Sequence, residues 1–121
     1  HERLTKIYRL RLADQSPMSL EEVYISNSLA PEFYKNDFEN QSIYHLLENK
    51  YNLVISHSDI KLGARAAGNF PAKWLDVKES SPLVYMESLT FLENQRPAFL
   101  TYANYPYDRY VFSLSLPRDN N

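Results

Sequence analysis

The sequence contains no cysteine and no long apolar run, and each absence excludes a class of protein. Without cysteine there can be no disulfide framework, no thiolate zinc site and no cysteine nucleophile. No apolar stretch approaches the roughly 18 residues that a membrane-spanning helix needs, and the first residues do not resemble a signal peptide. We therefore expect a cytoplasmic chain with no membrane partner.

Positive charge is not in excess either. The chain has 13 lysines and arginines against 15 acidic residues, with a net charge of −2, so direct nucleic-acid binding is not expected. The histidines His1, His45 and His57 lack metal-ligand spacing, and no serine stands in a nucleophile elbow. There is no GxGxxG or P-loop motif. The sequence thus predicts no enzyme, no metal site and no cofactor.

Glycine is also scarce, with two residues against ten tyrosines in 121 positions. The length fits one domain with its own core. Tyrosine combines an apolar ring with a polar tip, which suits interfaces and polar pockets. The alternative is that these aromatic side chains simply fill a β-sheet.

The first 25 residues predict a β-hairpin. Residues 4–13 alternate between apolar and charged side chains, residues 14–17 have turn composition, and residues 18–25 form a second strand-like run. A three-residue loop would set Glu21 opposite Arg9 on one face, whereas a two-residue loop would send Glu21 to the other face. The residues alone leave this register open.

The remaining pattern predicts an α+β domain. Residues 42–51 have helical spacing with Ser42 as N-cap, and a short helix begins at Asn69. Strand-like runs are predicted in four further segments: 54–66, 83–92, 98–104 and 110–116. This order favours an antiparallel sheet with helices packed on one side.

Three short features could bind an anion. Arg9 and Arg11 lie two positions apart on one strand face, and planar guanidinium forks suit phosphate or carboxylate. The hydroxyl of Ser42 lies beside helix-start N–H groups, and the hydroxyl of Tyr44 could turn toward the same anion. The alternatives are a solvated face for the arginines, capping alone for Ser42 and packing on the sheet for Tyr44.

Three segments between Arg9 and Arg118 resemble the UTRA ligand-binding domain of HutC-type GntR transcription regulators. The hairpin stretches RLRLAD and PMSLE are similar to the family pattern RxRLADGxPxxxE. The segment SIYHLLE resembles a helix start of the form SxYxxLE. The segment YPYDRYVF stands where members carry YRGDRYxF. Order and spacing also match the family.

The resemblance implies a chorismate-lyase-like antiparallel α+β fold that acts as a receptor. Residues 1–121 would then be the UTRA-type effector-binding domain of a longer regulator, with the N-terminal winged-helix DNA-binding domain outside this chain. The full-length protein would be a homodimer that contacts DNA only through that domain. Binding of a small effector would change the affinity of the full-length protein for its operator.

The resemblance further implies a pocket for a phosphorylated sugar or a similar anion. The side chains that it assigns to that pocket are Arg9, Arg11, Ser42 and Tyr44 around the phosphate, Glu21 as acceptor for the polar body of the ligand, and Tyr105 in the wall. Since Glu21 must then share a face with the arginines, the resemblance predicts the three-residue hairpin loop.

Two departures and two alternative functions accompany this assignment. Leu100 and Thr101 stand where amino-sugar-sensing members place polar or acidic residues, and Pro106-Tyr107 replaces Arg-Gly, so the sugar-recognising half of the pocket is expected to differ.

One alternative is a lyase of the chorismate-lyase type, which also uses arginines to hold carboxylates. The other is a dimerisation module with a vestigial pocket.

Overall fold

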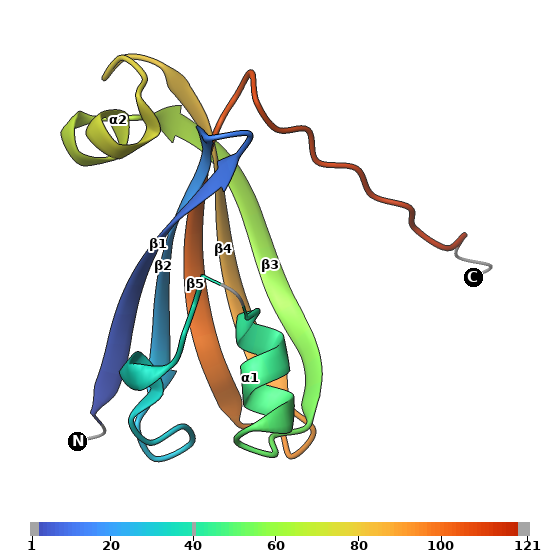
Figure 1. Ribbon diagram of the computed structural model, residues 1–121. Helices are drawn as coiled ribbons and strands as arrows, with labels where there is room; N and C mark the ends of the chain where they lie inside the picture. Colours follow the sequence, from blue (N-terminus) through green and yellow to red (C-terminus); the bar gives the residue numbers. More distant parts are fainter. Residues whose placement is uncertain (1–2, 40, 119–121) are drawn as a thin grey trace.

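The computed structural model describes residues 3–39 and 41–118 and contains one five-stranded antiparallel sheet with two α-helices (Figure 1). The elements in chain order are β1 (Leu4–Ala13), β2 (Ser16–Ser26), the 3-10 helix η1 (Phe33–Lys35), α1 (Ile43–Asn49), β3 (Ile55–Ala66), α2 (Asn69–Leu75), β4 (Pro82–Leu92) and β5 (Pro97–Pro106). The strand order in the sheet is β1-β2-β5-β4-β3. The predicted α+β class with an antiparallel sheet is confirmed.

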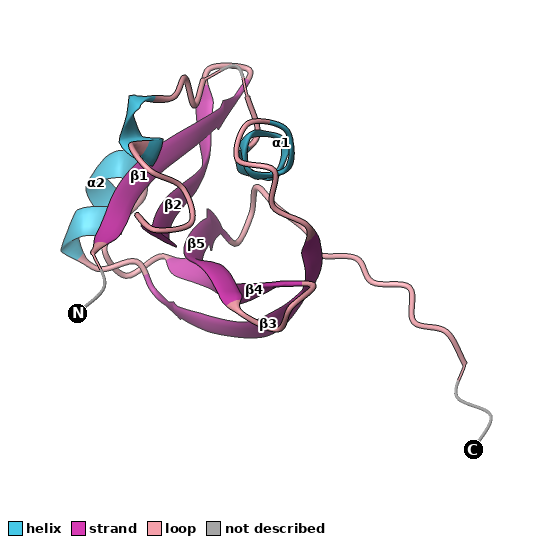
Figure 2. Ribbon diagram, turned by 90° about the horizontal axis from the view of Figure 1, so that it is seen from below, coloured by secondary structure: helices cyan, strands magenta, loops and turns pink. Residues whose placement is uncertain are grey.

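The sheet is curved, and α1 lies on its concave side (Figure 2). Alternation along β2 and β5 sends Val23, Ile25 and Phe99 to this side, where they form a core with Leu46 and Leu47 of α1. Every one of these five side chains is buried. This packing holds the start of α1 directly above the middle of the sheet.

The second helix packs against the opposite, convex face. Ala72 and Leu75 of α2 contact Leu20 of β2 and Leu83 of β4 in a second buried cluster. In β2, Leu20 alternates with Val23 and so points away from α1. The helices expected on one side of the sheet are therefore divided, with α1 on the concave face and α2 at the end of the convex face. Among the described residues, no helix is long and apolar enough to cross a membrane.

The hairpin formed by β1 and β2 has the predicted pairing of Arg9 with Glu21, but its loop differs from the predicted one. Only Asp14 and Gln15 form the turn, both with positive φ (50° and 66°), so the prediction of a three-residue loop was wrong. Two positive φ angles characterise the turns whose twist matches that of a β-hairpin. A register shift after Arg11 then adds one residue to β2, and Arg9 pairs with Glu21 as predicted.

Residues 110–116 do not form the predicted strand, since the last strand among the described residues is β5. The alternation is present, but a strand also needs a neighbouring strand for its N–H and C=O groups. Here the segment continues past β5 and extends away from the sheet (Figure 1). Only its start is packed, because Tyr110 and Phe112 contact the ring of Tyr105.

Four of the ten tyrosines lie on the convex face of the sheet and contact their neighbours there. On the convex face, Tyr24 and Tyr85 contact Tyr102 from either side, with ring centroids 6.1 Å away in each case. The hydroxyl groups of Tyr8 and Tyr24 both donate to the carboxylate of Glu22. For these four tyrosines, the sheet-filling interpretation is the one that the structure supports.

Arg109, in the segment after β5, donates hydrogen bonds both to β2 and to the end of α2. Its guanidinium donates to the carbonyl of Pro17 in β2 at 3.0 Å and to the carbonyls of Leu75 and Asp76 at the end of α2, at 2.7 and 3.3 Å. Charge-assisted hydrogen bonds of this kind contribute more than neutral ones. The arginine therefore fastens α2 to the hairpin.

Replacing Arg109 by alanine is expected to lower the free energy of unfolding by about 2 kcal/mol, because three carbonyl groups lose a charged donor. Urea unfolding of the domain measures the change. Arg118→Ala removes the same charge from an exposed position and is the matched control. Equal losses in the two variants would contradict this role for Arg109.

Candidate functional site

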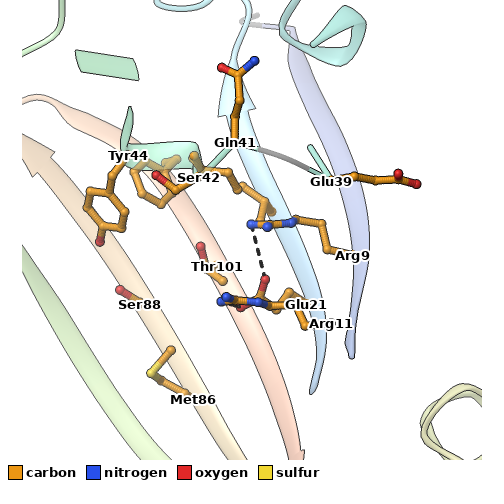
Figure 3. Close-up of a pocket in the computed structure, with 13 residues that line it drawn as sticks. Arg9, Arg11, Glu21, Glu39, Gln41, Ser42, Tyr44, Met86, Ser88 and Thr101 are labelled. Atoms are coloured by element: carbon orange, nitrogen blue, oxygen red, sulfur yellow. Dashed lines mark ion pairs between the residues drawn. The ribbon is translucent and has the colours of Figure 1, made fainter. Parts of the chain in front are cut away.

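A cleft of about 370 Å³ lies between the start of α1 and the concave face of the sheet (Figure 3). Side chains from β1, β2, β4, β5 and the segment that enters α1 line it. They are Arg9, Arg11, Glu21, Val23, Glu39, Gln41, Ser42, Ile43, Tyr44, Met86, Ser88, Phe99 and Thr101. Five of the six residues singled out in the sequence are thus brought together at one site.

Glu21 lies between the two arginines of β1. Its carboxylate oxygens are 3.6 Å from Arg9 Nη1 and 3.9 Å from Arg11 Nη1. Both distances allow ion pairing but exceed that of a hydrogen bond. The N–H groups of the guanidinium forks are therefore not committed to Glu21. Arg9 also donates from Nη2 to the carbonyl of Phe38 at 3.5 Å, which ties it to the loop before α1.

The charge balance of this trio favours an anion. Two guanidinium groups face one carboxylate, which leaves one positive charge in excess within the trio. Glu21 is buried, with 8% of its surface exposed, whereas Arg11 is exposed. Because a partly desolvated site screens charge less than water does, the excess attracts an anion into the cleft. Glu39 also lines the cleft, and its exposed carboxylate opposes this attraction less strongly because water screens it.

Ser42 and Tyr44 close the opposite wall of the cleft (Figure 3). The Ser42 hydroxyl accepts a hydrogen bond from the backbone N–H of His45 at 3.0 Å, as an N-cap does. The Tyr44 ring makes an edge contact with Phe99 at 5.4 Å, and its hydroxyl lies 3.5 Å from that of Ser58. Both side chains thus combine a structural contact with a hydroxyl at the cleft.

The two roles of Ser42 can be separated by substitution. Ser42→Ala is expected to lower the free energy of unfolding by about 1 kcal/mol, because the cap is lost. Ser42→Asp keeps a capping oxygen and therefore stability, but it adds a negative charge that weakens anion binding. Urea unfolding and calorimetric titration with phosphate measure the two effects, and equal anion affinity in Ser42→Asp and the unaltered chain would remove Ser42 from the site.

Tyr105 lies outside the lining of the cleft. It is buried on the same face of the sheet, between Tyr110 at 4.5 Å and Phe112 at 5.2 Å between ring centroids. Burial, followed by the negative charge of Glu21, raises the pKa of its hydroxyl to about 12. The tyrosine is thus neutral at physiological pH, and its ring packs against the segment after β5.

The sequence did not identify the floor of the cleft. The residues there that sequence patterns missed are Val23, Ile43, Met86, Ser88 and Phe99, and Thr101 was noted only as a departure from the family. Alternation in β5 could have found Phe99, since Phe99 and Thr101 share a face while Leu100 points to the convex side. Of the two residues that depart from the family pattern, Leu100 therefore lies outside the cleft, whereas Thr101 lines it.

Within residues 3–39 and 41–118, no three His, Asp or Glu side chains come close enough to hold a metal ion. What the cleft offers is guanidinium donors, hydroxyl groups, one buried carboxylate and an apolar floor. Such a surface can hold a small polar anion by charge and hydrogen bonds. Fold and site together define a curved-sheet α+β domain with a polar cleft beside the start of α1.

The chain belongs to the UTRA domain family, whose model matches residues 1–111. This confirms the resemblance seen in the hairpin, in the start of α1 and in the segment after β5. The matched residues include every residue that lines the cleft, as well as Tyr105 and Tyr110.

Known relatives are transcription regulators. The chain is 32% identical over 107 residues to the HTH-type transcriptional repressor NagR of Bacillus subtilis, covering 88% of this chain and 44% of NagR. A GntR-family regulator from Enterococcus faecalis has a similar structure, with a TM-score of 0.85 at 27% identity, covering 93% of this chain and 81% of that one. The C-terminal domain of the histidine utilization repressor from Pseudomonas syringae shares the fold, with a TM-score of 0.87 at 17% identity over 97% of this chain and 81% of that one. The chain spans less than half the length of NagR.

Proposed function

We propose that this chain is the effector-binding domain of a GntR-type transcription regulator and that its effector is a sugar phosphate or a similar small anion. The observation that carries the proposal is the cleft, which Arg9, Arg11 and Glu21 line from one side and Ser42 and Tyr44 from the other. In this proposal the arginines and hydroxyl groups hold the phosphate. Glu21 accepts hydrogen bonds from the hydroxyl groups of the sugar.

Size and polarity support this class of ligand. A cleft of about 370 Å³ is at the lower end of the roughly 300–1,000 Å³ typical of small-molecule sites, which suits a monosaccharide phosphate. Bidentate guanidinium groups match the geometry of phosphate oxygens. Met86 and Phe99 offer apolar surface for the ring of a sugar.

The rest of the regulator lies outside these residues in our proposal. A helix-turn-helix domain contacts the operator, and two copies of the full-length protein act as a dimer whose geometry the effector changes. The family membership and the partial coverage of NagR support this arrangement. The domain itself is a receptor and not an enzyme.

Ligand-induced stabilisation tests the proposal, because a ligand that binds only the native state raises its melting temperature. The probes are hexose 6-phosphates, the corresponding free hexoses, inorganic phosphate and amino acids. Each is titrated against the unaltered domain and against Arg11→Ala. Stabilisation by a hexose phosphate that is lost in the variant is the expected result.

Other results would redirect the assignment. Stabilisation by free hexoses alone would contradict the phosphate clamp. Release of product from chorismate by the domain would favour the lyase alternative, for which the named relatives give no support. Stabilisation by none of the probes would favour the dimerisation module with a vestigial pocket.

A further inference from the structure

Two hydroxyl groups on the floor of the cleft have no hydrogen-bond partner in the described part of the chain. Ser88 of β4 and Thr101 of β5 are paired across the sheet, and both line the cleft (Figure 3). Ser88 is buried, with 7% of its surface exposed. Among the described residues no buried side-chain oxygen lacks a partner, so the unpaired Ser88 hydroxyl is open to the cleft.

The neighbouring concave position on β4 carries a hydroxyl that the protein itself satisfies. Thr90 lies two residues beyond Ser88, is fully buried, and has its hydroxyl 2.7 Å from that of Ser58 on β3. Thr90 does not line the cleft. An unpaired polar group that is withdrawn from water costs free energy until water or a ligand completes its hydrogen bonds. The sheet thus pairs the hydroxyl outside the cleft and leaves those inside it available.

The two available hydroxyl groups lie in the direction in which a ligand held by the arginines would extend. Arg9 on β1 pairs with Glu21 on β2, and Glu21 pairs with Ala103 on β5, two residues from Thr101. Strands of a sheet are about 4.8 Å apart, so β5 and β4 lie about 5 and 10 Å beyond β2. A phosphate at the arginines therefore directs the rest of its molecule over Thr101 toward Ser88.

Apolar side chains flank both hydroxyl groups along the strands. Phe99 lies two residues before Thr101 on β5, and Met86 lies two residues before Ser88 on β4, so all four share the concave face. A sugar ring combines C–H surface with hydroxyl groups at its rim. In small-molecule sites, a few polar groups among apolar ones fix the orientation of the ligand. The floor matches a sugar ring in this respect.

The charges around the floor disfavour a cationic ligand body. The charged side chains that line the cleft are Arg9, Arg11, Glu21 and Glu39. Glu21 lies between the two arginines, and Glu39 is exposed to water, which screens its charge. An ammonium group over the floor would meet the excess positive charge of the arginine pair. A hydroxyl group, by contrast, both donates and accepts without adding charge.

From these features we infer that Ser88 and Thr101 determine the specificity of the cleft. Each exchanges a hydrogen bond with a hydroxyl group of an uncharged sugar body, while Arg9 and Arg11 hold the phosphate. The inference rests on the proposed function and narrows its ligand to the phosphate of a neutral hexose, with the phosphate of an amino sugar disfavoured. The two residues contact the sugar and are not needed to hold the phosphate.

The test removes each hydroxyl group with little change in side-chain shape. Ser88→Ala and Thr101→Val are the two variants. Thr90→Val makes the same change at the neighbouring concave position, which does not line the cleft, and is the matched control. The probes are the 6-phosphates of glucose, mannose and galactose, the 2-amino analogue of each, and inorganic phosphate, which reports on the arginines alone. Isothermal titration calorimetry gives the dissociation constants, and circular dichroism verifies the fold.

The unaltered domain should bind at least one neutral hexose phosphate several-fold more tightly than its 2-amino analogue. Each of Ser88→Ala and Thr101→Val should weaken binding of that hexose phosphate roughly 3- to 10-fold, as expected for the loss of one neutral hydrogen bond. The affinity for inorganic phosphate should stay unchanged in both. Thr90→Val should lower the melting temperature, because Ser58 loses its partner, but should leave every affinity unchanged.

Three results would overturn the inference while the proposed function stands. The first is an unchanged affinity for the hexose phosphate in either Ser88→Ala or Thr101→Val. The second is equal weakening of the hexose phosphate and of inorganic phosphate, because the variants would then act through the arginines. The third is a 2-amino analogue that binds as tightly as the neutral sugar phosphate. Binding of none of the sugar phosphates by the unaltered domain would instead reject the proposed ligand class, and the specificity assignment with it.

Discussion

Replacing Arg9 by alanine is expected to weaken binding of a hexose 6-phosphate about 10- to 150-fold with only a small loss of stability. Arg9 is the less exposed of the two cleft arginines and is held by Glu21 and by the carbonyl of Phe38. A charge-assisted hydrogen bond contributes about 1.5–3 kcal/mol, which corresponds to this range of affinity. Isothermal titration calorimetry measures the dissociation constant.

Two further variants show whether charge or geometry is responsible. Arg9→Lys keeps the charge but loses the planar fork, so it should fall between alanine and the unaltered chain. Arg96→Ala removes an exposed arginine from the turn between β4 and β5 and should leave affinity unchanged. An affinity of Arg9→Ala equal to that of Arg96→Ala would remove Arg9 from the anion site.

Replacing Glu21 by glutamine should change the affinities for two anions in opposite directions. The hexose phosphate should bind about tenfold more weakly, because the carboxylate that accepts from sugar hydroxyl groups is lost. Inorganic phosphate should bind more tightly, on the order of fivefold, because the competing negative charge between the arginines is removed. Competition titration of both anions against one protein sample measures the ratio.

The neighbouring residue provides the control for Glu21. Glu22→Gln makes the same change one position along β2, but Glu22 points to the convex face, where it pairs with Lys6 at 2.7 Å. The affinities for both anions should therefore stay as they are. If Glu21→Gln weakened both anions equally, the carboxylate would be a support for the arginines and not a contact of the ligand.

In the hairpin, sequence patterns predicted the strands and their pairing but not the turn. Alternation predicted β1 and the shared face of Arg9 and Arg11, and the family pattern predicted the pairing of Arg9 with Glu21. The turn itself was not predictable, because a two-residue turn plus a bulge gives the same pairing as a three-residue loop. Only the positive φ angles of Asp14 and Gln15 distinguish the two.

Long-range arrangement was the part that the sequence left undetermined. The clamp residues were named from motifs, whereas Met86 and Ser88 join them only because β5 lies beside β2 and β4 lies beside β5 in the sheet. No local pattern encodes that neighbour relation. The same limit explains residues 110–116, where alternation is present but the availability of a pairing strand is a property of the whole fold.

The position of β1 at the edge of the sheet has a consequence for local unfolding. Both cleft arginines belong to this strand, whose one sheet neighbour within the described residues is β2. A strand held from one side can detach while the remaining sheet and α1 stay folded. A ligand that bridges Arg9 and Ser42 would fasten that strand to the helix segment, so slower exchange of the β1 amide hydrogens would report occupancy of the cleft.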